Sequence, residues 1–145
     1  MPYLITAEFQ KRRSQSIATR RRISAALKGR RRKPLRDPQG GLTAEGRKWY
    51  RKKFGNRLRP GVRKPASRMS LQEMRRKGSW AKRFYGRQNL PPLVKPNGQP
   101  TRLALTARAW GEPVPRSPAA ARRIAAKGDS LLRRYHRLKK QRRKR

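Results

Sequence analysis

The least charged part of the chain is the stretch from Ser79 to Pro115, which holds two of the three tryptophans and an apolar run not crowded by charge. It opens with aromatic residues at helical spacing and continues into an apolar helix predicted between Thr101 and Gly111. Because aromatic side chains bury large areas, we expect Trp80 and Trp110 to be buried against each other's elements. The alternative is that these rings stack on unpaired bases, as in single-strand binders.

A second apolar pattern follows the Ser117-Pro118 pair, which is a typical helix start. Apolar and small residues recur there at alternating spacings of three and four, at Ala121, Ile124, Gly128, Leu131, Tyr135 and Leu138. The pattern predicts a helix of up to about six turns whose apolar seam packs on the aromatic core rather than on a coiled-coil partner. Gly128 and Asp129 leave open a break into two helices.

The clearest helix start in the chain lies just before the aromatic stretch. Ser70 and Glu73 have the S-x-x-E spacing of a capping box, and Met69 and Met74 occupy the flanking positions of a hydrophobic staple. We expect Gly78 to end this helix.

A basic helix is predicted earlier in the chain, where Thr43 is placed as the N-cap and Gly55 as the stop. Tyr50 and Phe54 lie four residues apart on it, with Trp49 beside them.

Three proline-rich segments separate these elements. Pro34 to Gly41 is predicted to be a linker, since its two prolines and two glycines propagate neither helix nor strand. Asn56 to Arg68 is expected to be extended and to follow a bound anion. Pro91 to Pro100 is expected to be extended, with a turn at Asn97-Gly98 and no strand.

These patterns predict a mostly α-helical protein, with short helices around a small aromatic core, basic extended arms and a long C-terminal helix. Residues 1–33 form a basic N-terminal arm, 34–41 a linker, 42–138 a small helical domain and 139–145 a basic tail in this interpretation.

The net charge of the chain is the strongest indication of its partner. The 145 residues carry 44 Lys and Arg against 6 Asp and Glu, a formal net charge of +38. Self-repulsion of this size favours a polyanionic partner. Arginines outnumber lysines by 30 to 14, and the planar guanidinium grips phosphate with two parallel hydrogen bonds. A merely solvated basic surface is the alternative, but ordinary surfaces mix both signs of charge.

Other classes of protein have less support. The chain has no cysteine, which excludes disulfides and thiolate metal sites, and no apolar run approaches the length of a membrane span. The Arg- and Ser-rich, acid-poor N-terminus weakly resembles an organellar transit peptide.

Residues 16–33 read SIATRRRISAALKGRRRK, in which Ser16 is placed to cap a helix and Gly29 to end it. This segment resembles the nuclease-associated modular DNA-binding motif of the third type, which occurs beside homing-endonuclease domains. The resemblance implies a helix that lies along DNA, with Ile23 and Leu27 on its supporting face. It also implies nucleic-acid contacts from Arg20, Arg22, Ser24, Lys28, Gly29, Arg30, Arg31 and Arg32.

A second resemblance extends from Gly40 to about His136. It rests on the blocks GGLTAEGRKWY, MRRKGSWAKRFYGR, LPPL, GQPTRLALTARAWGEPVP and AAARRIAAKG. They are similar to a small basic family of unknown function met in phages, large DNA viruses and bacteria. The resemblance implies a viral or phage-like context and brings no assigned activity.

Groups for catalysis are sparse. A nuclease needs carboxylates or histidines to hold a metal and activate water, and the chain has only His136 and six scattered acids. Glu45 and Glu73 suit helix N-termini, and Asp129 suits a cap. Glu112 has no evident place, and we expect it to pair with an arginine rather than to act in catalysis. We therefore expect no enzyme, no cofactor and no metal site.

The sequence thus predicts a non-catalytic nucleic-acid-binding protein that prefers DNA, with no membrane or small-molecule partner. One rival is a ribosomal or ribosome-associated RNA-binding protein, and the other is a virion or nucleoid structural protein that condenses DNA. We expect a cytoplasmic, nucleoid or virion-associated location, with an organelle as the alternative. Target sequence, strandedness and oligomeric state stay open.

Overall fold

The computed structural model describes residues 17–22, 24 and 33–145, and the chain divides into two units, residues 1–33 and residues 34–145. In the first unit, residues 17–22 and 24 are helical and exposed. The hydroxyl of Ser24 donates to the backbone oxygen of Arg21 at 3.0 Å. The other residues of the helix predicted between Ser16 and Gly29 lie outside the described part of the chain.

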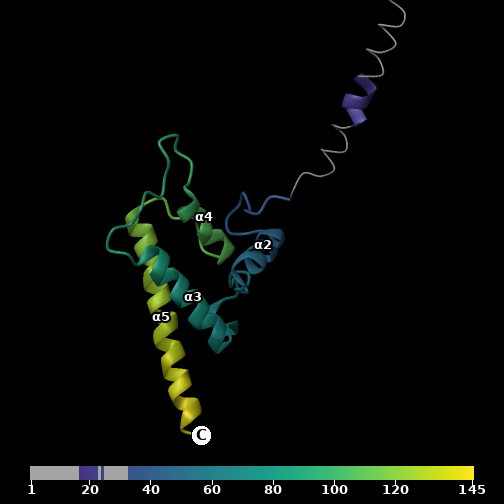
Figure 1. Cartoon of the computed structure of the whole chain (residues 1–145). Helices are drawn as coiled ribbons and strands as arrows, with labels where there is room; N and C mark the ends of the chain where they lie inside the picture. The colour runs from purple at the N-terminus through teal and green to yellow at the C-terminus, as the bar shows by residue number, and fades with distance from the viewer. Residues whose placement is uncertain (1–16, 23, 25–32) are drawn as a thin grey trace, which may run out of the picture. The chain divides into compact units, whose positions relative to one another are not determined.

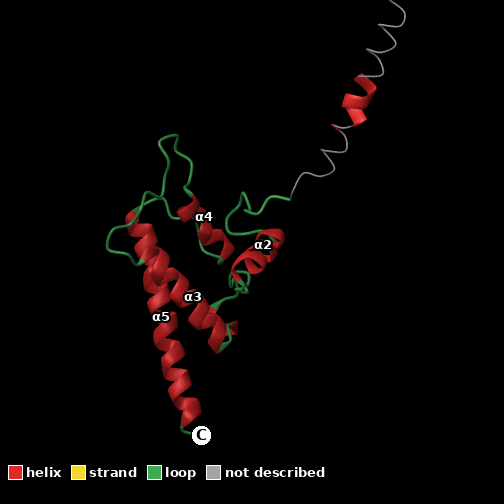
Figure 2. Ribbon diagram, viewed as in Figure 1, coloured by secondary structure: helices red, strands yellow, loops and turns green. Residues whose placement is uncertain are grey.

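The second unit is mostly helical, as predicted (Figures 1 and 2). Its elements are α2 (Ala44–Phe54), the short 3₁₀ helix η1 (Ala66–Arg68), α3 (Leu71–Tyr85), α4 (Arg102–Ala109) and α5 (Pro118–Arg143). Extended pairing among the described residues is limited to two isolated bridges, Arg36 with Leu42 and Val94 with Pro100. The predicted fold class is confirmed, including the aromatic core and the long C-terminal helix.

Helix starts follow the signals in the sequence. The side chains of Thr43, Thr101 and Ser117 accept backbone N–H groups in the first turns of α2, α4 and α5. Each of these bonds satisfies a donor that has no partner within its own helix. Gly55 ends α2 with a left-handed φ of 74°, a conformation that costs other residues steric strain.

The start of α3 has the predicted capping box. The Ser70 hydroxyl accepts the Glu73 N–H at 3.2 Å, and the Glu73 carboxylate accepts the Ser70 N–H at 2.9 Å. Met69 and Met74 flank this box and are buried in the same hydrophobic cluster, together with Leu131 of α5. The staple therefore fixes the chain entering α3 against the C-terminal helix.

The prediction that Gly78 ends a helix is wrong, because α3 runs on without a break to Tyr85. Gly78 instead lies where α3 and α5 approach each other closely. A Cβ built on Gly78 would lie 2.8 Å from the backbone oxygen of Gly128, and one built on Gly128 would lie 2.6 Å from the Cβ of Ala81. Both positions need glycine because the two backbones pass where side chains would otherwise stand.

The apolar seam of α5 packs within the same chain, as expected. Ala121, Ile124, Gly128 and Leu131 are buried, and the seam continues through the partly buried Tyr135 and Leu138. The helix is not broken at Gly128. Asp129 does not cap a helix but lies 3.6 Å from the Lys82 Nζ of α3. The residues predicted to form a basic tail continue the helix as far as Arg143.

The aromatic core forms between α3, α4 and α5. Trp80 is 6% exposed and stacks on Trp110, with ring centroids 4.9 Å apart and planes 10° from parallel. Tyr85 packs edge-on against Trp80, and its hydroxyl donates to the backbone oxygen of Leu103 at 2.7 Å. This confirms the prediction that each tryptophan packs against the element that carries the other one. Stacking on bases is thereby excluded for Trp80, whose ring is covered by protein.

The segment predicted to be a linker is bonded to α4. The Arg102 guanidinium donates to the backbone oxygens of Asp37 at 2.7 Å and Gly41 at 2.9 Å, and Arg108 bonds to the Gln39 side chain. Residues 34–41 therefore pack as part of the helical unit rather than as a free connection. The proline and glycine content predicted that this segment forms neither helix nor strand. It could not predict the hydrogen bonds to α4, because those residues lie about 60 positions further along the chain.

Pro34–Thr43 and Pro92–Thr101 form the same loop and share the sequence pattern P-L-x-x-P-x-G-x-x-T. In each copy one isolated bridge closes the loop, and the final threonine donates its N–H to the leucine carbonyl, at 3.1 Å and 3.0 Å. The same threonine hydroxyl bonds to the proline carbonyl at the start of the loop and caps the following helix. The unit is thus an internal repeat of a loop followed by a helix, α2 in one copy and α4 in the other.

We predict that Gly128→Ala destabilises the protein by about 1 to 3 kcal/mol, because the new methyl group overpacks the contact with Ala81. Helix propensity alone would stabilise α5 by roughly 1 kcal/mol, so the sign of the change separates the two effects. Denaturant unfolding followed by circular dichroism measures it. An alanine variant as stable as the parent would show that the helices do not approach this closely.

Candidate nucleic-acid interface

The structure describes three of the site residues implied by the N-terminal motif. Arg20, Arg22 and Ser24 are exposed on the helical part of the first unit. The others, Lys28, Gly29, Arg30, Arg31 and Arg32, lie outside the described residues. The 11 Lys and Arg of residues 1–33 are only a quarter of the 44 in the chain, so most of the positive charge belongs to the helical unit.

An open cavity of about 1160 Å³ in the helical unit is lined by several of these basic residues. It lies between the start of α2, the connection that precedes α3, the exposed side of α3, and α4. Its lining contains a single acid, Asp37, whose carboxylate accepts the Gln39 N–H at 2.8 Å. The basic residues in the lining are all arginines: Arg47, Arg57, Arg59, Arg63, Arg75, Arg76 and Arg83.

Two of these arginines are tied to the protein, and the other five are free. Arg47 donates to the backbone oxygen of Leu42 at 2.8 Å, and Arg76 donates to that of Pro60 at 2.6 Å. The free guanidinium groups are exposed and make no hydrogen bond or ion pair within the described chain; they belong to Arg57, Arg59, Arg63, Arg75 and Arg83. Such groups are available to an anion from solution.

The inner surface of the cavity is aromatic. Trp110, Trp80 and Phe84 line it, and the Arg76 guanidinium lies 5.7 Å from the centroid of the Trp110 ring. This cation–π contact and the bond to Pro60 fix the direction of the Arg76 side chain. These rings give the cavity part of its apolar lining.

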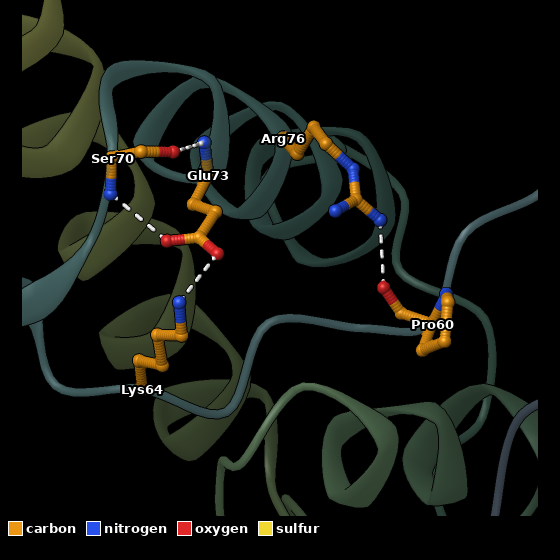
Figure 3. A network of polar contacts seen from close by, with 5 residues as sticks. All are labelled: Pro60, Lys64, Ser70, Glu73 and Arg76. Atoms are coloured by element: carbon orange, nitrogen blue, oxygen red, sulfur yellow. Dashed lines mark hydrogen bonds and ion pairs between the residues drawn. The ribbon is translucent and has the colours of Figure 1, made fainter.

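The extended wall of the cavity is held to α3 by the network in Figure 3. Lys64 donates to the Glu73 carboxylate at 2.9 Å, and Arg76 holds Pro60 from the same helix. Between them Val62 is buried. The hydrogen bond from the Ser70 N–H and the one from Lys64 lower the pKa of Glu73, so this carboxylate stays charged. The segment predicted to be extended is thus fixed in place, although its last residues, Ala66–Arg68, form the 3₁₀ helix η1 rather than extended chain.

Glu112 is the most buried acid described, and its partners are lysines rather than the expected arginine. Its two carboxylate oxygens lie 2.9 Å from the Lys77 Nζ of α3 and 3.0 Å from the Lys127 Nζ of α5. Burial by itself would raise the pKa of Glu112, but the hydrogen bonds and charges of the two lysines outweigh it and lower the pKa. Glu112 thus joins α3 and α5 through the connection after α4.

The other described acids are also engaged. Glu45 lies 3.6 Å from Lys48 within α2, and Asp129 pairs with Lys82. Within the part of the chain that the structure covers, no group of three or more acidic, His or Cys side chains is arranged to hold a metal ion. The lining of the cavity thus combines seven arginines with Asp37 as its one acid.

Residues 35–110 match a protein family described as domain of unknown function DUF6321. The chain belongs to this family. The matched range of the DUF6321 domain contains every residue that lines the arginine cavity, whereas α5 lies beyond it. No curated protein and no solved structure matches the chain.

The resemblance to a family of unknown function, which was predicted from Gly40 to about His136, is therefore confirmed as far as Trp110. The N-terminal motif lies outside the DUF6321 match. Among the described helices, none has the length and apolar character needed to cross a membrane.

Sequence reasoning named site residues on the N-terminal arm alone. It expected the segment from Asn56 to Arg68 to follow a bound anion, but it did not join that segment to the arginines of α3. The arginines of the cavity come from separate parts of the chain, and no local spacing marks them as a group. Two signals were present in the sequence: the arginine-rich connection from Asn56 to Arg68, and the basic residues on both sides of the capping box, in RPGVRK and MRRK.

We predict that Glu112→Gln destabilises the protein by roughly 3 kcal/mol, because it leaves the buried Lys77 charge without a partner. Since the pKa of Glu112 in the folded protein is below its ordinary value of 4.5, the carboxylate stabilises the fold above that pH. This contribution is lost as the pH falls through the folded pKa.

Urea unfolding between about pH 6 and about pH 3 should therefore show a steeper loss of stability in the parent protein than in the variant. The control is Glu45→Gln, which removes an exposed pair within α2 and should change stability by less than about 1 kcal/mol. Equal effects of the two substitutions would contradict a structural role specific to Glu112.

Proposed function

We propose that this DUF6321 protein is a non-catalytic nucleic-acid-binding protein that prefers DNA and binds the phosphate backbone through arginine and lysine. The observation that carries the proposal is the cavity with five free arginines and one internally bonded acid. Guanidinium groups match the geometry of phosphate oxygens, with which they form paired hydrogen bonds.

The charge balance supports the same partner. The helical unit has 33 Lys and Arg against 5 acids, so neutralisation within the protein leaves most cations unpaired. A polyanion that binds such a surface releases condensed counterions, which supplies a sequence-independent driving force. Phosphate contacts of this kind position a protein on nucleic acid without reading bases.

The preference for DNA rests on the N-terminal segment. Its resemblance to the nuclease-associated modular DNA-binding motif supports a second contact, made by the arm at residues 16–32, while the acids of the helical unit support no nuclease chemistry. A phage or viral context, with the protein on the nucleoid or in the virion, is part of this proposal and is argued from sequence resemblance alone.

The first test replaces three free arginines of the cavity, Arg57, Arg59 and Arg63, with glutamine. Binding to a duplex should weaken, and the slope of log affinity against log salt should become shallower by up to about 3, since each lost phosphate contact removes roughly 0.9. Fluorescence anisotropy over a series of salt concentrations measures both quantities.

The matched control replaces Arg116, Arg123 and Arg137, which are exposed, lie outside the cavity and remove the same charge. It should reduce affinity much less. If the two triple variants lose affinity equally, net charge rather than the cavity determines binding, and binding that does not depend on salt would reject the electrostatic proposal altogether.

The second test compares the full chain with one that begins at Pro34, where the helical unit begins. We predict that removing residues 1–33 weakens duplex binding without unfolding the core, because residues 34–41 are bonded to α4 and stay with it. Tryptophan fluorescence reports on the stacked Trp80 and Trp110, and a duplex titration reports on binding. Equal affinity of the two chains would show that the arm makes no contact with DNA.

A further inference from the structure

Helix α2, whose place in the fold is shown in Figure 1, carries a cluster of aromatic rings in which Trp49 and Phe54 are exposed and Tyr50 is half-buried. Trp49 is 44% exposed and Phe54 is 53% exposed. Their ring centroids lie 6.2 Å apart at an interplanar angle of 80°, and Tyr50 lies 4.6 Å from Phe54. Lys53 places its Nζ 4.8 Å from the centroid of Trp49 and 5.6 Å from that of Phe54. Large exposed rings of this kind mark an interaction surface.

Comparison of the two copies of the internal repeat shows that the exposed positions of α2 correspond to buried positions of α4. When the two loops are superposed by their shared pattern, Gly46 of α2 corresponds to Ala104 of α4, and Trp49 corresponds to Ala107. Ala104 and Ala107 are both buried in the core, whereas Gly46 is the only buried residue of α2. The copy that stays outside the core thus has a tryptophan where the packed copy has a methyl group.

The surroundings of the cluster identify the chemistry of its partner. Besides Lys53, the helix and the residues after it present Arg47, Lys48, Arg51, Lys52, Arg57 and Arg59. The single acid of α2, Glu45, already pairs with Lys48. A second copy of this chain would bring the same positive charges against these, which disfavours self-association. An anion with exposed flat rings satisfies both the charge and the aromatic surface.

Unpaired nucleic acid has this combination, since its phosphates are anionic and its bases offer open faces for stacking. In a duplex the faces of the bases are covered by their neighbours, and only the phosphates and groove edges are available. We propose that the aromatic cluster of α2, formed by Trp49, Tyr50 and Phe54, is a stacking site for unpaired bases. This inference rests on the proposed nucleic-acid binding and adds a preference for single strands at one defined surface.

The test uses the full chain and two labelled probes, an oligothymidylate of about 20 nucleotides and a mixed-sequence duplex of about 20 base pairs, at one salt concentration. Replacing Trp49 and Phe54 together by alanine should weaken binding to the single strand at least tenfold, because each lost stack costs roughly 5- to 150-fold. Duplex affinity should change less than about twofold, since no charge is removed.

The matched control is the double change Trp49→Phe and Phe54→Tyr, which keeps two flat rings at the same positions. It should retain single-strand affinity to within about threefold of the parent protein. Near-ultraviolet circular dichroism of Trp80 and Trp110 checks that each variant keeps its core, which we expect because the two substituted rings are exposed.

Three results would overturn the inference. Unchanged single-strand binding by the alanine variant would show that the rings make no stack. Equal loss on both probes would show that they act through the fold or through general affinity. A dimer of the parent protein that dissociates in the alanine variant would assign the cluster to self-association. A parent protein that binds neither probe would instead refute the proposed function itself.

Discussion

The stacking of Trp80 on Trp110 is the central aromatic contact of a core that α3, α4 and α5 build together. It joins α3 to the end of α4 and forms the inner surface of the arginine cavity. The indole N–H of Trp80 has no hydrogen-bond partner within the described structure, so apolar burial must also offset the cost of that group.

The acids of the protein are used to build this core rather than to neutralise its surface. Glu73 closes the capping box and holds Lys64, while Glu112 joins Lys77 to Lys127. Glu73 and Glu112 thus hold junctions between elements, whereas Glu45 pairs within α2, and with only five acids in the helical unit most of its positive charge is left to the solvent. A surface with this balance is suited to a polyanion, which connects the packing of the fold to the proposed function.

The two copies of the internal repeat differ in role: one packs in the core, and the other is exposed to solvent. Both copies use the same loop to start a helix, through Thr43 in one and Thr101 in the other. Helix α4 buries small residues in the core, whereas α2 carries basic and aromatic side chains that remain open to solvent. The first loop docks on α4 through Arg102, which places the start of α2 at the rim of the arginine cavity.

The sequence alone determined the features that arise from neighbours along the chain. The Ser70–Glu73 capping box, the Met69–Met74 staple and the apolar seam of α5 were predicted because caps and helix faces depend on residues a few positions apart. The repeated loop was also present in the sequence, as two copies of one spacing, but the helix patterns on either side concealed it.

Tertiary structure decided whatever depends on residues far apart. Gly78 has the local signature of a helix stop, yet the backbone of α5 passes over it and requires the same residue inside a helix. Residues 34–41 have the composition of a linker, but an arginine from α4 bonds them to the helical unit. The partners of Glu112 and the convergence of the cavity arginines follow from how the helices cross, because contacts between distant segments leave no periodicity in the chain.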